Sequence, residues 1–162
     1  MMPSLIGRNI QLCCLDFSGC GLSEGDYISL GYFERNDLER VIEYLQYYEN
    51  ISCINIWGRS MGASTCLMTE KINSSVNCIV MDGPFKSLKS VCEYRAKEDL
   101  GIPNVITQTM LKLVRKTIKS TANFDIYDLK PYVNAKNYDV PAYFIAAKDD
   151  SMIPLEHIQE IY

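Results

Sequence analysis

The sequence lacks the features that mark several large classes of protein. It has one histidine in 162 residues, and its seven cysteines form no Cys-x-x-Cys pair and no cysteine–histidine cluster of zinc spacing. No apolar run approaches the roughly 18 residues that a membrane helix requires. The net charge of -4 argues against the nucleic-acid backbone as a main partner. We therefore expect that the chain contains no zinc module and no transmembrane segment, and that it does not bind nucleic acid.

The amino-terminal residues and the cysteines bear on the compartment. Arg8, Asn9 and Gln11 interrupt the apolar residues near the start, unlike a secretory signal. Most cysteines lie in apolar runs, as reduced, buried thiols do, which predicts a cytoplasmic protein. No repeat or linker-like composition divides the chain, so we expect a single domain over residues 1–162.

Short apolar runs alternate with amphipathic segments along the chain. This pattern predicts strands at residues 10–17, 53–57, 78–81 and 142–147, and helices at 32–48 and 61–71. Such alternation indicates an α/β fold with a mostly parallel sheet and helices on both faces. Functional sites in these folds lie at the carboxyl ends of the strands.

Residues 86–130 break this alternation, because two helices, at 88–100 and 105–120, follow each other without a strand between them. The second helix gathers apolar residues on one side and basic residues on the other. We interpret the insertion either as a helical cap over the site or as ordinary amphipathic surface structure. A basic helix that faces a membrane is a third interpretation.

One motif carries chemistry: Gly58-Arg59-Ser60-Met61-Gly62 directly follows the strand at 53–57 and opens a helix. A sharp strand-to-helix turn can hold a serine exposed beside a base, which makes it nucleophilic. The backbone N–H of Met61 would then point at the developing oxyanion. We expect glycines at both flanks because the neighbouring backbone passes too close for side chains. The alternative is a tight turn whose serine only caps the helix.

Together with three further segments, at residues 16–25, 82–85 and 149–154, this turn resembles the α/β-hydrolase superfamily. The resemblance is nearest to its serine-aminopeptidase-like and acyl-esterase branch. It implies a serine hydrolase that cleaves a carboxylic ester, thioester or amide of a small acyl substrate through an acyl-enzyme on Ser60. No metal or cofactor is implied. The resemblance also implies earlier and later strands, so we expect a domain incomplete at both ends, with exposed sheet edges that allow self-association.

The resemblance assigns the acid of the catalytic triad to Asp150, with Asp149 and Asp82 as alternatives. Asp16, in the glycine-rich loop, is expected to bond loop backbone rather than to react. The family places its histidine well downstream of the acid, whereas His157 is too near, so we expect His157 at the surface or at a helix start. Without an evident base, a non-catalytic or truncated hydrolase-like module is the alternative function. The sequence identifies no substrate-binding residue.

Overall fold

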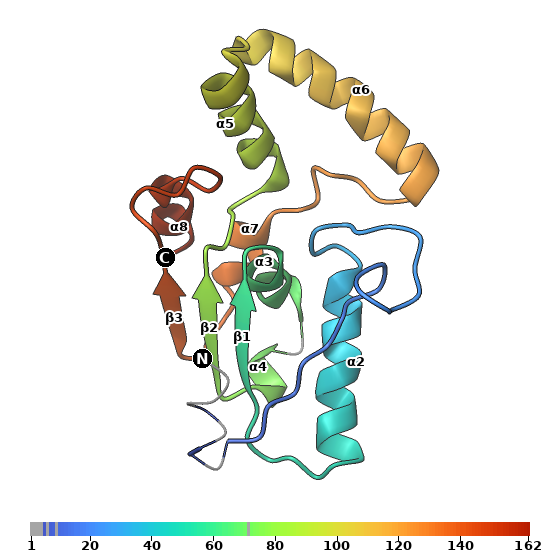
Figure 1. The fold of residues 1–162 in the computed structure, drawn as a ribbon, viewed down its shortest axis with the longest axis vertical. Helices are drawn as coiled ribbons and strands as arrows, with labels where there is room; N and C mark the ends of the chain where they lie inside the picture. The colour runs from blue at the N-terminus through green and yellow to red at the C-terminus, as the bar shows by residue number, and fades with distance from the viewer. Residues whose placement is uncertain (1–4, 6, 9, 71) are drawn as a thin grey trace.

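A three-stranded parallel sheet forms the centre of the molecule. The computed structural model describes residues 5, 7–8, 10–70 and 72–162. Within them, β1 (Asn55–Arg59), β2 (Cys78–Asp82) and β3 (Ala142–Ile145) pair in the order β1-β2-β3. All three arrows point the same way in Figure 1, so their carboxyl ends share one edge. The predicted α/β class and parallel sheet are confirmed.

The helices follow the predicted alternation closely. Those at 32–48, 88–100 and 105–120 are found as α2 (Glu34–Tyr47), α5 (Leu88–Leu100) and α6 (Asn104–Ala122). The helix predicted at 61–71 ends earlier, as α3 (Met61–Met68), and residue 71 itself lies outside the described residues. Short helices complete the set: α4 (Ile72–Ser75), α7 (Pro131–Ala135) and α8 (Leu155–Ile161).

A tertiary contact coincides with the end of α3. Thr69 leaves the helical region with a ψ of 118°. The hydroxyl of Tyr138 lies 2.7 Å from the carbonyl oxygen of Leu67, and within 3.1 Å of the carbonyls of Cys66 and Thr69. Terminal helix carbonyls have no partner within the helix, so Tyr138 supplies the hydrogen-bond donor that this end lacks.

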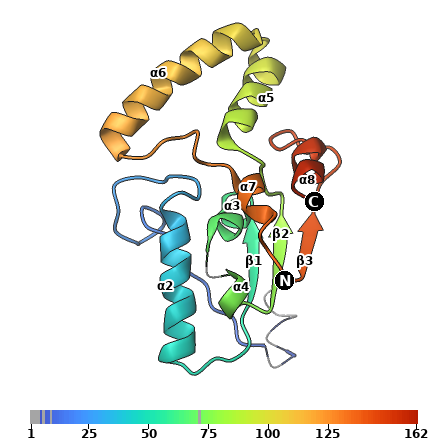
Figure 2. The ribbon, with the colours of Figure 1, turned by 180° about the vertical axis from the view of Figure 1, so that it is seen from behind.

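Helices cover one face of the sheet. Ile56, Ile79, Met81 and Phe144 share this face by strand register, and all pack in one apolar cluster with residues of α3. Helix α3 lies directly on β1 and β2, and α2 and α7 pack against α3. In the view from behind, α3, α4 and α7 lie in front of the strands (Figure 2). This cluster is the main core.

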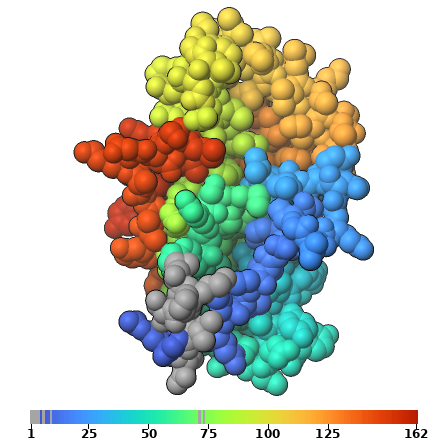
Figure 3. Space-filling view, in the orientation of Figure 1, coloured from blue at the N-terminus to red at the C-terminus, as the bar shows by residue number. Residues whose placement is uncertain are grey.

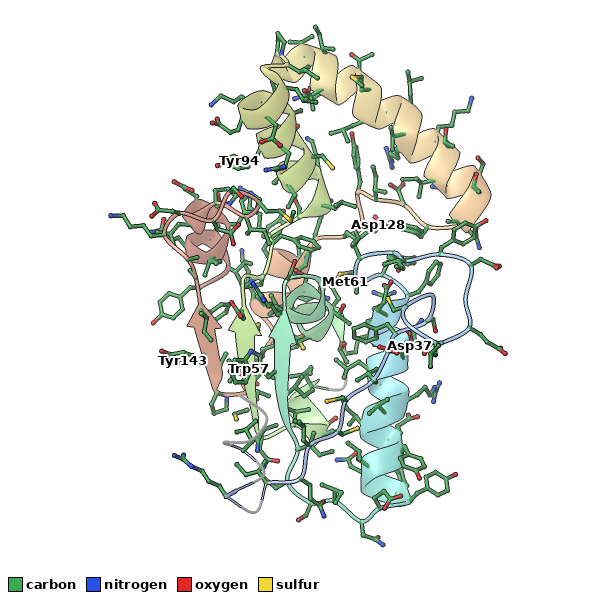
Figure 4. All side chains as sticks on the ribbon, in the orientation of Figure 1. Asp37, Trp57, Met61, Tyr94, Asp128 and Tyr143 are labelled. Carbon is green, nitrogen blue, oxygen red and sulfur yellow. The ribbon has the colours of Figure 1, made fainter. Side chains whose placement is uncertain are left out.

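The opposite face of the sheet carries a row of three neighbouring side chains. Trp57, Val80 and Tyr143 are register partners across the three strands, and the residues Trp57 and Tyr143 are 45% and 66% exposed. Figure 4 labels both of them on the near side of the strands. We expected helices on both faces; among the described residues, no helix packs on this one.

The segment at residues 10–17 is not a strand, which corrects our prediction. It is irregular, and residues 10–16 are exposed. The resemblance places a further strand between this segment and β1, and none of the described residues fills that place. A strand requires a hydrogen-bonded neighbour, so an apolar run without one stays outside the sheet.

Helices α5 and α6 form a pair beyond the carboxyl ends of the strands (Figure 1), which confirms the helical insertion; a role as a cap over the site stays a prediction. A second apolar cluster, which includes Leu111, Phe85 and Phe124, joins this pair to the body. Arg115 of α6 donates two hydrogen bonds of 2.7 and 2.6 Å to Asp125, in the segment that leads back to the sheet. A bidentate ion pair of this kind fixes the return segment against the helix.

Candidate active site at the turn between β1 and α3

Ser60 is the only residue between the end of β1 and the start of α3. Its backbone has φ 51° and ψ -114°, outside the regions that residues with a side chain normally occupy. Two hydrogen bonds fix the turn: the Ser60 amide donates to the carbonyl of Asp82 at 2.7 Å, and the Ser64 amide donates to the carbonyl of Ser60 at 3.0 Å. The Ser60 side chain makes no capping hydrogen bond, which argues against a merely capping serine.

The two glycines of the motif have different roles. A Cβ at position 58 would lie 2.5 Å from the carbonyl carbon of Gly62, so only glycine fits at Gly58. A Cβ at position 62 would meet nothing within 4 Å. The expectation that crowding requires glycine on both flanks is therefore confirmed for Gly58 and wrong for Gly62. The Cβ of residue 58 would clash with the backbone of residue 62, whereas a Cβ on residue 62 would point into open space.

Met61 opens α3 at the carboxyl end of β1, below the α5–α6 pair (Figure 4). The first amides of a helix have no acceptor one turn earlier, so the N–H of Met61 is available to a ligand. It follows Ser60 directly. This position suits an oxyanion donor, although its use in catalysis stays a prediction.

Ser64 is a supporting residue that the sequence analysis missed. It is fully buried, and its hydroxyl accepts a hydrogen bond of 3.1 Å from the amide of Phe85. Because Ser64 lies one turn after Ser60, this bond ties α3 to the loop that follows β2. Two adjacent polar residues, Ser64 and Thr65, inside a helical stretch without charged residues were the signal that could have identified it.

Asp150 lies in a turn after β3. One of its carboxylate oxygens, Oδ1, accepts hydrogen bonds from the amides of Met152 at 2.8 Å and Ile153 at 2.9 Å. Arg95 of α5 donates to the carbonyl of Ser151 at 2.8 Å, which links this turn to the helical pair. The turn thus holds the Asp150 carboxylate in place at the strand-end side of the sheet.

The two rival acids are placed differently. Asp149 is exposed. Asp82 ends β2, and its carboxylate lies 3.7 Å from the guanidinium of Arg59, on the uncovered face of the sheet. Since Arg59 already neighbours this carboxylate, Asp82 is the poorer candidate to orient a histidine.

His157 lies in the first turn of α8, as expected for a helix start, but it is not at the surface. The side chain is 4% exposed, and its Nδ1 has no hydrogen-bond partner among the described residues. Burial, with a further contribution from Lys86, lowers the pKa of this histidine. Apolar residues on both sides of it in α8, such as Ile158, turn this side of the helix inward. No hydrogen bond of the described residues joins His157 to Ser60 or Asp150.

The glycine-rich loop is held by carboxylates. Asp16 accepts a hydrogen bond from the amide of Leu22 and, through its carbonyl, one from the hydroxyl of Ser23, which confirms its predicted structural role. Glu34, a charged residue on the same side of α2 as Leu38 and Ile42, is 1% exposed. It accepts bonds from Ser29 and from the amide of Gly31, and so anchors the loop to α2.

A hollow of about 370 Å³ lies between this loop and the end of α6, lined by Tyr27, Ile118 and Phe124 among others. Ser60 is not among its lining residues. Within the part of the chain that the structure describes, no three His, Cys, Asp or Glu side chains gather as metal ligands would. Substrate-binding residues therefore stay unassigned.

The parallel sheet, the strand-to-helix turn at Ser60 and the helical pair beyond the strand ends define an α/β-hydrolase fold, part of which this chain spans. The Pyrococcus furiosus esterase Pf2001 superposes with a TM-score of 0.65 and 23% sequence identity, over 91% of this chain and 53% of that chain. A lipase-esterase related protein from Clostridium acetobutylicum ATCC 824 gives a TM-score of 0.55 at 20% identity, over 90% and 67%.

In sequence, the chain is 27% identical to the uncharacterized protein YqkD of Bacillus subtilis (strain 168) over 160 residues. That match covers 97% of this chain and 51% of YqkD. The chain thus spans about half the length of both YqkD and Pf2001. No family model matches the sequence.

Proposed function

We propose that this chain carries the nucleophile of a serine hydrolase that cleaves carboxylic esters, thioesters or amides. Ser60 attacks the carbonyl carbon, the N–H of Met61 stabilises the resulting oxyanion, and the acyl group passes to Ser60 Oγ as the leaving group departs. Asp150 orients the histidine that takes the proton. The observation that carries the proposal is the φ of 51° at Ser60. Two hydrogen bonds hold this conformation, one donated by the Ser60 amide and one accepted by the Ser60 carbonyl.

Strained backbone costs free energy and persists where the surrounding structure enforces it, most often at functional sites. At Ser60 this strain separates the serine from a simple helix cap. The superposition on the esterase Pf2001 and on a lipase-esterase related protein adds support for the reaction class. Esters or thioesters are favoured over amides because esters are the commonest targets of this fold.

No base is assigned, because the single histidine, His157, is buried in α8 and no hydrogen bond of the described residues joins it to Ser60 or Asp150. We further propose a cytoplasmic location, since all seven cysteines are free thiols. The expectation that most of them are buried is wrong, because only Cys66 is buried and Cys13, Cys14 and Cys53 are exposed. Self-association through the free edge of β1 is part of the same proposal, because an unpaired strand edge can pair with another chain. Among the described residues, no helix is long and apolar enough to cross a membrane.

A second candidate is a hydrolase-like module that binds without catalysis. The buried His157, which has no bond to Ser60 or Asp150, favours it. A fluorophosphonate probe separates the two functions, because it forms a covalent bond with an activated serine only. We would label the chain, the Ser60→Ala variant and the control Ser120→Ala, with and without free imidazole as a replacement base.

Labelling that Ser60→Ala abolishes and Ser120→Ala retains would support the hydrolase, and dependence on imidazole would show that the base is the missing part. No labelling of the chain under either condition would contradict the proposal and favour the binding module. Ser120 is an exposed residue of α6, so its substitution is a matched control for the loss of a hydroxyl.

A further inference from the structure

Helix α6 differs from the rest of the chain in charge. It contains four cationic residues and no Asp or Glu, in a chain of net charge -4. Arg115 pairs with Asp125, and Lys119 lies 3.5 Å from the same carboxylate. Lys112 and Lys116 form no ion pair within the described ranges. The helix therefore presents uncompensated positive charge on an acidic protein.

The same helix exposes apolar side chains along one side, which we call the free apolar side. It consists of four residues at helical spacing that are 46–67% exposed: Ile106, Met110, Leu113 and Val114. A different side of α6, with Thr107, Leu111 and Ile118, packs against the body. The free apolar side is thus additional to the packed one, and within the described structure nothing covers it.

The cations are arranged around this side as in a helix that lies at a lipid surface. At 100° per residue, Lys112 and Lys116 lie about 110–150° around the helix from the centre of the free apolar side. When the apolar side is buried in the acyl region, such lysines stay at the level of the headgroups. In the space-filling view the helical pair forms one end of the molecule, so α6 can reach a flat surface (Figure 3).

We propose that α6 binds to the surface of an anionic phospholipid bilayer through Ile106, Met110, Leu113 and Val114, with Lys112 and Lys116 contacting lipid phosphates. The uncompensated cations favour an anionic surface as the occupant. With 19 residues and four charges, α6 lies on the bilayer and does not cross it. This inference does not depend on the reactivity of Ser60.

The test is flotation of the 162-residue chain with vesicles of phosphatidylcholine alone and with about one third phosphatidylserine. Leu113→Gln removes apolar area without a change of charge, and its control is Leu22→Gln, a fully exposed leucine in the glycine-rich loop. Lys112→Gln/Lys116→Gln removes two charges from α6, and Lys136→Gln/Lys148→Gln removes two exposed lysines elsewhere. Circular dichroism of each variant checks its fold.

We expect the chain to partition to the phosphatidylserine vesicles and to be released by high salt. Each lysine near an anionic surface contributes about fivefold in partitioning, so the α6 double variant should bind about 25-fold more weakly. Leu113→Gln should weaken binding at least fivefold, since it removes a leucine side chain from the apolar contact. Both controls should stay within about twofold, because neither alters the contact.

Three results would overturn the proposal. The first is that the folded chain binds neither type of vesicle. The second is that the control variants lose as much binding as the α6 variants, which would indicate a general charge or hydrophobicity effect. The third is self-association that Leu113→Gln abolishes, without vesicle binding, which would identify the free apolar side as a protein interface.

Discussion

The strained backbone at Ser60 predicts that glycine at this position stabilises the fold. A side chain in such a conformation costs about 1–3 kcal/mol, and Ser60→Gly removes that cost. Glycine also loses more chain entropy on folding, about 0.5–1 kcal/mol. The serine hydroxyl makes no capping bond, so its loss subtracts little. We expect Ser60→Gly to raise the free energy of unfolding by about 0.5–2 kcal/mol.

Ser60→Ala is the matched control, because alanine also lacks the hydroxyl but keeps the Cβ that causes the strain. Its free energy of unfolding should stay within about 0.5 kcal/mol of the wild type. Urea unfolding can be followed by the fluorescence of Trp57, the only tryptophan, which lies in β1 just before the turn. With a slope of about 1–3 kcal/mol per molar urea, a gain of 1 kcal/mol moves the midpoint by about 0.3–1 M.

Equal midpoints for Ser60→Gly and Ser60→Ala would refute the reasoning. They would mean that the turn carries no strain at Ser60, and the observation that supports the nucleophile would then lose its force. A change of slope in either variant would show that the compactness of a state had changed, so only variants with the wild-type slope are compared.

Three further predictions concern the surroundings of the turn. Gly58→Ala should destabilise the chain by several kcal/mol or prevent folding, because the added Cβ would overlap the backbone of Gly62. Gly62→Ala should change the free energy of unfolding by less than about 1 kcal/mol in the same urea assay, because its Cβ would meet no other atom. Tyr138→Phe should cost about 1–3 kcal/mol by thermal unfolding, because it leaves buried carbonyls at the end of α3 without a donor; an unchanged midpoint would contradict the cap. The lowered pKa of His157 means that the folded state disfavours the charged form of this histidine. The free energy of unfolding should therefore fall as pH drops below about 6.5, and His157→Leu should make that fall shallower. The same dependence of unfolding free energy on pH in the wild type and in His157→Leu would contradict this prediction.

Periodicity and turn residues predicted most of the elements. The 3.6-residue pattern identified α2 and α6 to within two residues at each end, because α2 buries one side in the main core and α6 buries one side in the second apolar cluster. The turn at Ser60 was equally accessible, since the close approach that requires glycine at Gly58 involves the backbone of Gly62, only four residues later. Local chemistry was sufficient in these segments.

Contacts between distant residues account for the differences. The apolar run at 10–17 shows hydrophobicity, but the sequence does not show whether a neighbouring strand is present to pair with it. Glu34 is a charged residue one turn before Leu38 on the buried side of α2, and its burial depends on the loop at Ser29 and Gly31, which folds over its carboxylate. The end of α3 coincides with a tyrosine about 70 residues later in the chain. Side-chain partners of this kind leave no periodic signal.

The hydrogen bonding at the two ends of α3 also has an electrostatic consequence. Peptide dipoles leave a partial positive charge at the amino end of a helix and a partial negative charge at the other. The Tyr138 hydroxyl directs its proton toward the negative end, at Leu67 and Thr69, whereas the positive end opens at Met61 beside Ser60. The helix dipole therefore stabilises a negative charge that develops at Ser60 by about 0.3–1 kcal/mol, without a contribution from any side chain.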